Sequence, residues 1–592
     1  MKRIVSILLA ALMLLGMAAC GGNSPARTTE AAQSATQAPQ IPETEAPTEA
    51  PVETTQPAET AVPTQPVETT APTEPEPVFQ PVKTASSDPV NWGVEWELLQ
   101  NGGVVESFQR EQPIDFDPEE TYFALPGIAT FRGDHLRSGA TYGTAQITSN
   151  SIDLCWHNET GALADLAGGV WAGCGWTGQP LVVQWDEETK QIMNLYEDKK
   201  AKEGLVEVIY ATLCGTIYFM DLDDGSYTRD PMYVGMCFKG SGALDPRGYP
   251  LMYVGSGDFD AYNNRPRMYV ISLIDTTVLY EYGNNEPMQL RTDNDAWCAF
   301  DSSPLVHGET DTLIWPGENG ILYTIKLNTQ YDKGAGTISV APEHVVAARY
   351  DTARSGSSEY WYGMEASASI VGSYLYVSEN GGMFYCVDLN TMELVWAQDT
   401  LDDSNGSPVF EYISQEEAYV YTAPSLHWNR EEGEFWGTIH IYKLNALTGE
   451  VVWAKPYDVA TKDGASGGVQ ATGLLGKEGS NIEGLIIYPV ARYGALYSGA
   501  LVALDTETGE EGWSTHTQLY AWSSPVALYT EDGTAYIVTA DAEGTVRLVD
   551  GATGEVLDTA DIWSIVEASP VVFGNKLVVG TRGYMIHCLE VN

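Results

Sequence analysis

Residues 503–513 read ALDTETGEEGW, and near-copies of this stretch recur along the second half of the chain. Residues 443–453 read KLNALTGEVVW, residues 386–396 read CVDLNTMELVW, and residues 548–557 read LVDGATGEVL. An Asp or Asn followed four positions later by Gly predicts a tight turn, because Gly tolerates positive φ and the Asx oxygen accepts backbone amides. Trp513 then supplies a large flat surface that can be buried between neighbouring units.

Each copy ends a unit of four short strands. Two apolar strands joined by a Gly-containing connection precede it, as in YIVTADAEGTVRLVD (536–550), and a small-residue segment such as SSPVA (523–527) lies further upstream. The Asp or Asn that opens the last turn stands at positions 388, 445, 505 and 550, at intervals of 57, 60 and 45 residues. Short strands at such even spacing indicate an all-β repeat, and four-stranded units of about 40–60 residues are propeller blades.

The two ends of the repeat region complete one another. The chain ends in three strands without a fourth, ASPVVFGNKLVVGTRGYMIHCLEVN (568–592), while IDLCWHNETG (152–161) is a single strand far upstream. Pairing these segments closes a ring and leaves no open sheet edge. The sequence therefore predicts an all-β, eight-bladed propeller of four-stranded antiparallel blades over residues 125–592, with the ring closed by residues 152–161.

The repeat resembles a known family. The pattern A-x-D-x-x-T-G-x-x-x-W is carried by Ala503, Asp505, Thr508, Gly509 and Trp513. It resembles the pyrroloquinoline quinone (PQQ)-like β-propeller repeat, which also builds the quinoprotein alcohol dehydrogenases. The resemblance covers roughly residues 125–592 and weakens near 177–235, 236–285 and 298–345. FRGDHLRSGATYG (131–143) resembles the lead-in that many such proteins place before the first strand. A WD40 interpretation is weaker, because the paired G-H and W-D signature is missing.

The resemblance does not extend to the enzyme's cofactor motifs. In PQQ-dependent dehydrogenases the family pattern includes a vicinal Cys pair beside the quinone, a Ca²⁺ held by carboxylate and amide ligands, and a catalytic Asp. This sequence contains no adjacent cysteines, and no stretch matches the calcium ligands or the Asp. We therefore expect no cofactor, no metal site and no catalysis. A PQQ- and Ca²⁺-dependent oxidoreductase, or sugar-active chemistry by an acidic pair such as Asp301 and Glu365, is the enzymatic alternative.

Strand order predicts where a binding site would lie. Loops that join the second and third strands of a blade share one face with the loops that lead to the next inner strand, and both sets are long and rich in aromatic and acidic residues. Such residues around a concave mouth are typical of a binding site. The candidates are Asp301, Trp361, Glu365, His427, Trp428, Trp436, Arg492, Tyr493, Trp522 and Glu567. The alternative is that the aromatic side chains pack the loops against one another.

The first 124 residues are predicted to deliver and tether the propeller. MKRIVSILLAALMLLGMAAC (1–20) has the basic start and short apolar run of a secretory signal. Its end resembles a bacterial lipoprotein cleavage site, which implies lipidation of Cys20 and anchoring to the outer face of the cell membrane. A plain signal peptide is the alternative. Residues 21–86 form a Pro/Thr/Glu-rich linker with too few apolar residues for a core, and residues 87–124 are expected to pack on the propeller.

Charge limits the choice of partner. The chain has 30 Lys+Arg against 81 Asp+Glu, a formal charge of −51. Nucleic acid is disfavoured, because phosphate binding requires a basic surface. The sequence favours a cell-surface lipoprotein that acts as a non-catalytic binding or scaffold module for an extracellular carbohydrate or protein. A further alternative is a scaffold like the propeller lipoprotein of outer-membrane β-barrel assembly, from which the long spacer and large loops depart.

One pair of cysteines is predicted to meet. Without Cys20 seven cysteines remain, an odd number for an exported protein. Aligning MIHCLE (585–590) with MFYCVD (383–388) places Cys588 beside Cys155 on neighbouring strands of the closing blade. A disulfide there would link the two ends of the ring, and two free thiols are the alternative.

Overall fold

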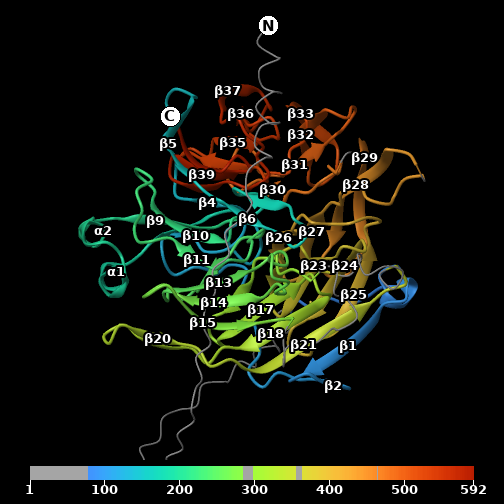
Figure 1. The fold of residues 1–592 in the computed structure, drawn as a ribbon. Coiled ribbons are helices and arrows are strands. Elements are labelled where there is room, and N and C mark those ends of the chain that lie inside the picture. Colours follow the sequence, from blue (N-terminus) through green and yellow to red (C-terminus); the bar gives the residue numbers. More distant parts are fainter. Residues whose placement is uncertain (1–77, 285–297, 355–362, 432, 463) are drawn as a thin grey trace, which may run out of the picture. The chain divides into compact units, whose positions relative to one another are not determined.

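The computed structural model describes residues 78–592, except residues 285–297, 355–362, 432 and 463. Cys20, the signal segment and nearly all of the predicted linker lie outside these residues. Eight sheets of four or more strands follow one another in a ring (Figure 1). The predicted all-β, eight-bladed propeller of antiparallel blades is thereby confirmed.

In blades 1 to 7 the strands run from inner to outer in chain order, and blades 1 to 4 come first in the sequence. Blade 1 consists of β8 (Leu181–Gln184), β9 (Val206–Ala211), β10 (Thr216–Asp221) and β11 (Met232–Tyr233). Blade 2 consists of β12 (Ala243–Leu244), β13 (Leu251–Gly255), β14 (Met268–Ser272) and β15 (Thr277–Tyr282). Blade 3 consists of β16 (Leu305–His307), β17 (Thr312–Gly317), β18 (Ile321–Lys326) and β21 (Glu343–Asp351). Blade 4 consists of β22 (Ser369–Val371), β23 (Tyr374–Ser378), β24 (Met383–Asp388) and β25 (Glu393–Asp399).

The second half of the chain forms the other four blades in the same way. Blade 5 consists of β26 (Val409–Ser414), β27 (Glu417–Thr422), β28 (Trp436–Asn445) and β29 (Val451–Ala460). Blade 6 consists of β30 (Leu474–Leu475), β31 (Leu485–Ala491), β32 (Ser498–Asp505) and β33 (Glu511–Gln518). Blade 7 consists of β34 (Val526–Tyr529), β35 (Ala535–Ala540), β36 (Thr545–Asp550) and β37 (Val556–Asp561). Blade 8 consists of β38 (Val571–Phe573), β39 (Lys576–Thr581), β40 (Met585–Val591) and, from upstream, β5 (Ile152–Glu159).

The ring closes through blade 8. Strand β5 pairs antiparallel with β40, with His157 opposite His587. The predicted closing strand is therefore confirmed. A ring closed by pairing strands from both ends of the repeat region leaves no blade incomplete.

Side chains along the middle strands of a blade pack alternately into two cores, one on each side of the blade. In β32, Val502 and Leu504 join the core shared with blade 5, whereas Leu501 and Ala503 join the core shared with blade 7. Successive side chains point to opposite faces of a strand, and here both faces are covered by a neighbouring blade. This explains why these strands read as continuous apolar runs.

The recurring Asp, Gly and Trp fasten neighbouring blades together. Gly509 has φ of +71°, and Asp505 Oδ1 accepts the Thr508 amide at 2.8 Å. In four blades the outer-strand Trp lies against the turn Gly of the next blade, as in the pairs Trp156–Gly225, Trp396–Gly449, Trp453–Gly509 and Trp513–Gly554. In each pair the indole Nε1 donates to the carbonyl three residues before that Gly, at 2.9–3.1 Å. The motif is therefore a joint between blades.

Residues 126–145, the inner belt, run inside the ring and contact every blade. The belt contains β3 (Gly127–Ile128), which pairs with β8, and β4 (Thr141–Tyr142), which pairs with β38. Hydrogen bonds connect the belt to blades 2 to 7 through Leu244, Ser303, Ile370, Phe410, Gly473 and Tyr529. The belt thus fills the axis of the ring at the inner strands.

Two arginines of the belt are completely buried. The Arg137 guanidinium donates to the carbonyls of Ala368, Phe131 and Ser303 at 2.8–3.0 Å. Arg132 has no exposed surface and donates to the Gly473 carbonyl at 3.2 Å. The Arg-Gly-Asp tripeptide that begins at Arg132 is therefore a structural part of the belt.

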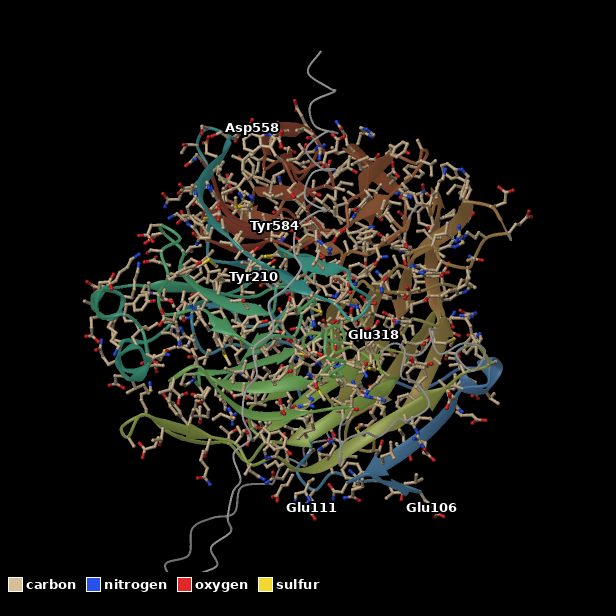
Figure 2. All side chains as sticks on the ribbon, viewed as in Figure 1. Glu106, Glu111, Tyr210, Glu318, Asp558 and Tyr584 are labelled. Carbon is tan, nitrogen blue, oxygen red and sulfur yellow. The ribbon has the colours of Figure 1, made fainter. Side chains whose placement is uncertain are left out.

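The N-terminal extension runs along blades 3 and 4. After η1 (Pro89–Trp92), β1 (Glu95–Gln100) pairs with β21, and β2 (Gly103–Val105) extends the edge further. Figure 2 shows Glu106 and Glu111 of this extension at the periphery of the ring. The Phe116 amide donates to the Gly372 carbonyl in the first turn of blade 4. The extension therefore covers part of the face that carries the Asp-Gly turns, which we call the turn face.

Short insertions complete the fold. They are the helices α1 (Glu187–Ile192) and α2 (Glu197–Ala201), the hairpin of β6 (Ala162–Ala164) and β7 (Val170–Ala172), and the hairpin of β19 (Gln330–Asp332) and β20 (Thr337–Ser339). Neither α-helix reaches the length and hydropathy of a membrane span, and no other helix in the described part of the chain does.

Candidate functional site

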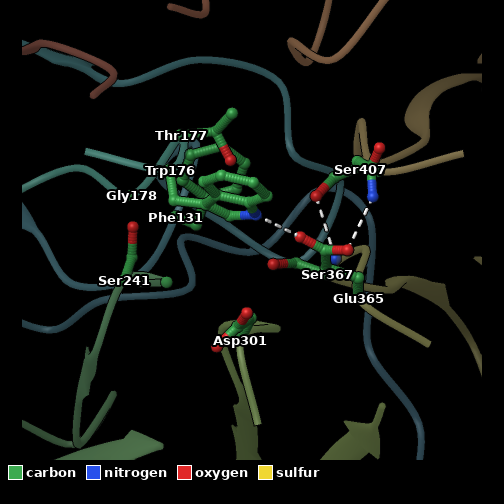
Figure 3. Close-up of a pocket in the computed structure, with 11 residues that line it drawn as sticks. Phe131, Trp176, Thr177, Gly178, Ser241, Asp301, Glu365, Ser367 and Ser407 are labelled. Atoms are coloured by element: carbon green, nitrogen blue, oxygen red, sulfur yellow. Dashed lines mark hydrogen bonds between the residues drawn. The ribbon is translucent and has the colours of Figure 1, made fainter. Parts of the chain in front are cut away.

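The face opposite the turn face, which we call the loop face, surrounds the mouth of the central channel. Phe131, Trp176, Asp301, Glu365 and Asn405 line a cavity of about 20 Å³ there (Figure 3). This volume accommodates a water molecule or two. The described part of the channel mouth is therefore nearly filled by the protein's own side chains.

Trp176 is the side chain that fills the mouth. It follows the β6–β7 hairpin, and its ring meets Trp171 and Trp522 edge-on at centroid distances of 6.3 and 6.0 Å. The Lys239 ammonium lies 5.5 Å from the same ring. With the inner belt on the other side, Trp176 closes the cavity from the loop face.

Glu365 anchors Trp176 in this position. Its two carboxylate oxygens accept hydrogen bonds from Trp176 Nε1 and Asn405 Nδ2, both at 2.6 Å (Figure 3). The carboxylate is thus engaged by neutral donors from two segments. Its arrangement serves to position the ring.

Asp301 and Lys239 form a buried pair beside Trp176. Lys239 Nζ lies 3.5 Å from Asp301 Oδ2, and each side chain is 3% exposed. Burial raises the pKa of Asp301 to about 7, Lys239 opposes this rise, and the nearby Glu365 adds to it. Lys239 thus lies among several carboxylates at the channel mouth.

More acids surround this pair than sequence reasoning selected. Glu318, which Figure 2 shows near the middle of the ring, and Asp403 are buried, and burial raises the pKa of both carboxyls well above the usual range. Burial also raises the pKa of Glu379 to about 7 and of Asp402 to about 6. No group of three or more His, Cys, Asp or Glu side chains in the described segments is arranged to hold a metal ion.

The structure brings four of the predicted residues to the channel. They are Asp301, Glu365, Trp522 and Glu567. Trp522 is 5% exposed and donates from Nε1 to the Ser466 carbonyl at 3.2 Å. Glu567 accepts from Tyr520 at 3.2 Å and faces Arg582 at 3.4 Å, and burial raises its pKa. These contacts give Trp522 and Glu567 a packing role.

The other predicted residues lie further out on the loop face. His427 contacts Asp403 at 3.3 Å, and burial with the nearby Arg430 lowers its pKa to about 4. The Trp428 ring lies 5.7 Å from the Arg354 guanidinium. Arg492 is 7% exposed and donates to the Lys462 carbonyl at 2.5 Å, whereas Tyr493 is 37% exposed. Trp361 lies outside the described residues.

Trp436 borders a second hollow, on the loop face. Together with Asn429, Arg430, Glu431, Glu434, Gly437 and Thr438 it lines a groove of about 400 Å³ beside β28. One wall is fixed by Asp402, whose carboxylate accepts the amides of His427 and Asn429 at 2.9 and 3.0 Å. An indole edge, two exposed carboxylates, a guanidinium, an amide and a hydroxyl form its polar lining.

Exposed aromatic side chains gather in the connections of the loop face. They are Tyr262, Phe435, Trp436, Tyr493, Tyr497, Trp563 and Tyr584, with 37–88% of their surface exposed. Trp563 and Tyr584 belong to neighbouring connections, since the Arg582 amide donates to the Ile565 carbonyl at 3.0 Å. These side chains are distributed over the connections of several blades, and exposed aromatic residues are enriched at contact surfaces.

Sequence reasoning missed Trp176, Lys239, Glu318 and Asp403. Trp176 lies in WAGCGWTG (171–178), outside any recognisable repeat, although two tryptophans among glycines are an unusual composition for a connection. The other three stand next to connections whose packing depends on distant blades. No local pattern marks them.

The described channel mouth is too small for the quinone cofactor of the dehydrogenases whose repeat this sequence resembles. A pocket for a ligand of that size has a volume of about 300–1,000 Å³, whereas the described mouth leaves about 20 Å³. Trp176 lines this space, and Trp522 packs against the Trp176 ring. No two of the seven cysteines in the described region are adjacent in the chain.

Comparison with known proteins supports the type of repeat. A family model described as outer membrane protein assembly factor BamB, of the PQQ_2 type, matches residues 441–590. A protein named outer membrane protein assembly factor BamB, from Kangiella koreensis, is 33% identical over 93 residues, which are 16% of this chain. The match spans 23% of that relative's length.

Solved structures with the same fold include quinoproteins. Quinohemoprotein alcohol dehydrogenase from Comamonas testosteroni gives a TM-score of 0.51 at 13% identity, over 79% of this chain and 80% of that one. A europium-containing methanol dehydrogenase gives 0.50 at 13% identity, over 78% and 98%. Residues 441–590 thus carry repeats of the PQQ_2 type, and the likeness to the dehydrogenases concerns the fold.

Proposed function

We propose that this protein is an exported, lipid-anchored PQQ-like propeller that acts as a non-catalytic docking module, with its loop face as the contact surface for an extracellular carbohydrate or protein. The observation that carries this proposal is the contrast between a filled channel mouth and a loop face rich in exposed aromatic side chains. A propeller whose axis is filled offers its connections, rather than its channel, to a ligand.

The groove beside Trp436 supports ligand binding on this face. Its volume of about 400 Å³ lies within the usual range for small-molecule sites. The indole edge can stack on the apolar face of a sugar ring, while Glu431 and Glu434 can accept hydrogen bonds from hydroxyl groups. The same lining would also accept a protein side chain.

The N-terminal residues of the described chain do not cover the loop face. The Phe79 ring packs edge-on against Tyr374 and Phe410, beside the first turns of blades 4 and 5 on the turn face. The described part of the N-terminal segment thus leaves the loop face free for a partner.

A thermal-shift screen of the full chain in detergent tests the proposal. The panel contains cell-wall and plant glycans, Ca²⁺, and PQQ with Ca²⁺, because a specific ligand raises the melting temperature by mass action. A glycan shift that Trp436→Ala abolishes and Tyr280→Ala retains would support the loop face. Tyr280 is a suitable control because it is 36% exposed on the outer strand β15. A shift with PQQ and Ca²⁺ beyond that with Ca²⁺ alone would overturn the non-catalytic assignment.

A second candidate is a scaffold in outer-membrane protein assembly. It is favoured by the BamB family match over residues 441–590. Fractionation of the host envelope tests it: recovery with an outer membrane would support this role, and recovery with the cytoplasmic membrane alone would refute it.

A further inference from the structure

We propose that Cys155 and Cys588 form a disulfide in the exported protein and so close the ring covalently. Cys155 lies in β5 and Cys588 in β40, the two strands that join the ends of the propeller. The proposal is independent of what the loop face binds.

The pairing of the two strands brings the sulfurs together. Cys588 stands opposite Trp156, and the register then shifts, so that Leu589 stands opposite Leu154. Cys155 is the extra residue at this irregularity, directly beside Cys588 in the paired strands, and the two thiols are close enough that each shifts the pKa of the other. Cys588 and its paired residue Trp156 are expected to have Cα atoms about 4.5–5.5 Å apart, and Cys155 is the neighbour of Trp156 in the chain. A disulfide spans Cα distances of about 4.4–6.8 Å, which this arrangement can meet.

The two thiols differ in exposure and in pKa, which decides the one that reacts first. Cys155 is exposed, and its pKa is lowered, first by the hydrogen bond with Cys588 and also by Lys576. Cys588 is buried, and its pKa is raised by the same hydrogen bond and by burial. Cys155 is therefore the thiol that meets an oxidant first, because the thiolate is the attacking species.

The oxidant is a low-mass disulfide such as oxidised glutathione. The Cys155 thiolate attacks one sulfur of this disulfide, expels the other as a thiolate, and forms a mixed disulfide. Cys588 then loses its proton to solvent and attacks Cys155 Sγ, which expels the second small thiolate. Two protein thiols are oxidised, and one small disulfide is reduced to two thiols.

Blade 4 contains the same strand geometry without the second cysteine. Cys386 stands opposite Trp396, and the register shifts at the following residue, as it does at Cys588. The position that corresponds to Cys155 is Val395, so Cys386 is a buried thiol without this partner. The protein thus supplies its own matched control.

The test is peptide mapping of the full chain in detergent after incubation with oxidised glutathione and alkylation of the remaining thiols. We expect a peptide cross-linked through Cys155 and Cys588, with Cys386 alkylated only after unfolding. The oxidised protein should melt a few degrees above the reduced protein, and Cys155→Ser should remove this difference while Cys386→Ser retains it. Separate alkylation of Cys155 and Cys588 after oxidation would overturn the proposal.

A gain-of-function variant tests the geometry itself. Val395→Cys should cross-link to Cys386 under the same conditions, because it recreates the pair in blade 4. Cross-linking in both blades would support the register argument. A cross-link in blade 4 but not in blade 8 would contradict the assignment of Cys155 and Cys588.

Discussion

The indole ring of Trp513 lies against Gly554 of the next blade so closely that a Cβ at Gly554 would stand 2.6 Å from the ring. Trp513 Nε1 also donates to the Gly551 carbonyl at 3.0 Å. A Gly in this turn thus serves two purposes, a positive φ and room for the neighbouring Trp.

These two purposes can be separated by substitution. Gly554 has φ of +75° and Gly484 has φ of +78°, but nothing lies within 4 Å of a Cβ at Gly484. We expect Gly484→Ala to cost about 1 kcal/mol of stability, from backbone strain alone. Gly554→Ala should cost about 1–3 kcal/mol more, because the indole must move. Denaturant unfolding measures both, and equal losses would show that the Trp contact is unimportant.

The two buried arginines of the inner belt should respond differently. Arg137→Met removes donors to three buried carbonyls, and we expect a loss of about 3–5 kcal/mol. Arg132 Nε and Nη1 have no hydrogen-bond partner among the described residues. Arg132→Met should therefore change the unfolding free energy by less than about 1 kcal/mol, or increase it, because an incompletely satisfied buried charge is replaced by an apolar side chain. Equal destabilisation by both variants would refute this difference.

Buried acids should make the protein more stable at mildly acidic pH. Burial raises the pKa of Glu379 to about 7 from an ordinary value of 4.5. The folded state then binds this proton more tightly than the unfolded state, so stability falls as pH rises between about 4.5 and 7. From pH 5.5 to 7.5 we expect Glu379 to contribute a loss of about 1–2 kcal/mol. Glu379→Gln should reduce the slope in unfolding experiments across this range, and an unchanged slope would contradict the shifted pKa.

Substitution of Trp522 should destabilise the protein much more than substitution of Trp436, although both are predicted from sequence to bind a ligand. Trp522→Ala empties a buried position and should cost about 3–5 kcal/mol. Trp436 is 41% exposed, so Trp436→Ala should cost about 1 kcal/mol or less. Melting curves without ligand measure both values. A large loss for Trp436→Ala would mean that this side chain supports the loop instead of presenting a surface.

The repeat could be predicted because its signal is local. Asp505, Gly509 and Trp513 fall within nine residues. Asp505 accepts a turn amide, Gly509 adopts a positive φ and Trp513 bonds to the next blade. In blade 4 Met392 takes the place of the Gly and still has φ of +59°. The turn therefore persists where its preferred residue is lost.

The filled channel could not be predicted from sequence. Trp176 reaches Glu365 across 189 positions of the chain, and Arg137 reaches Ala368 across 231. Such contacts depend on the closed ring and leave no periodic pattern. The aromatic loops were correctly placed on one face by strand order, but whether each ring points outward, as Trp436 does, or inward, as Trp522 does, depends on neighbouring blades.

The inner belt and β5 also affect how the chain can mature. Both precede all the inner blade strands in the sequence, yet their partners include the last residues: Val572 bonds to Ala140, and the Asn592 amide donates to the Ser151 carbonyl at 3.0 Å. A ribosome or an export channel releases these early segments before any partner in blade 8 exists. The ring can therefore be completed only after the final residues have emerged, and a chain that lacks β40 would leave both its closing strand and part of its axis without partners.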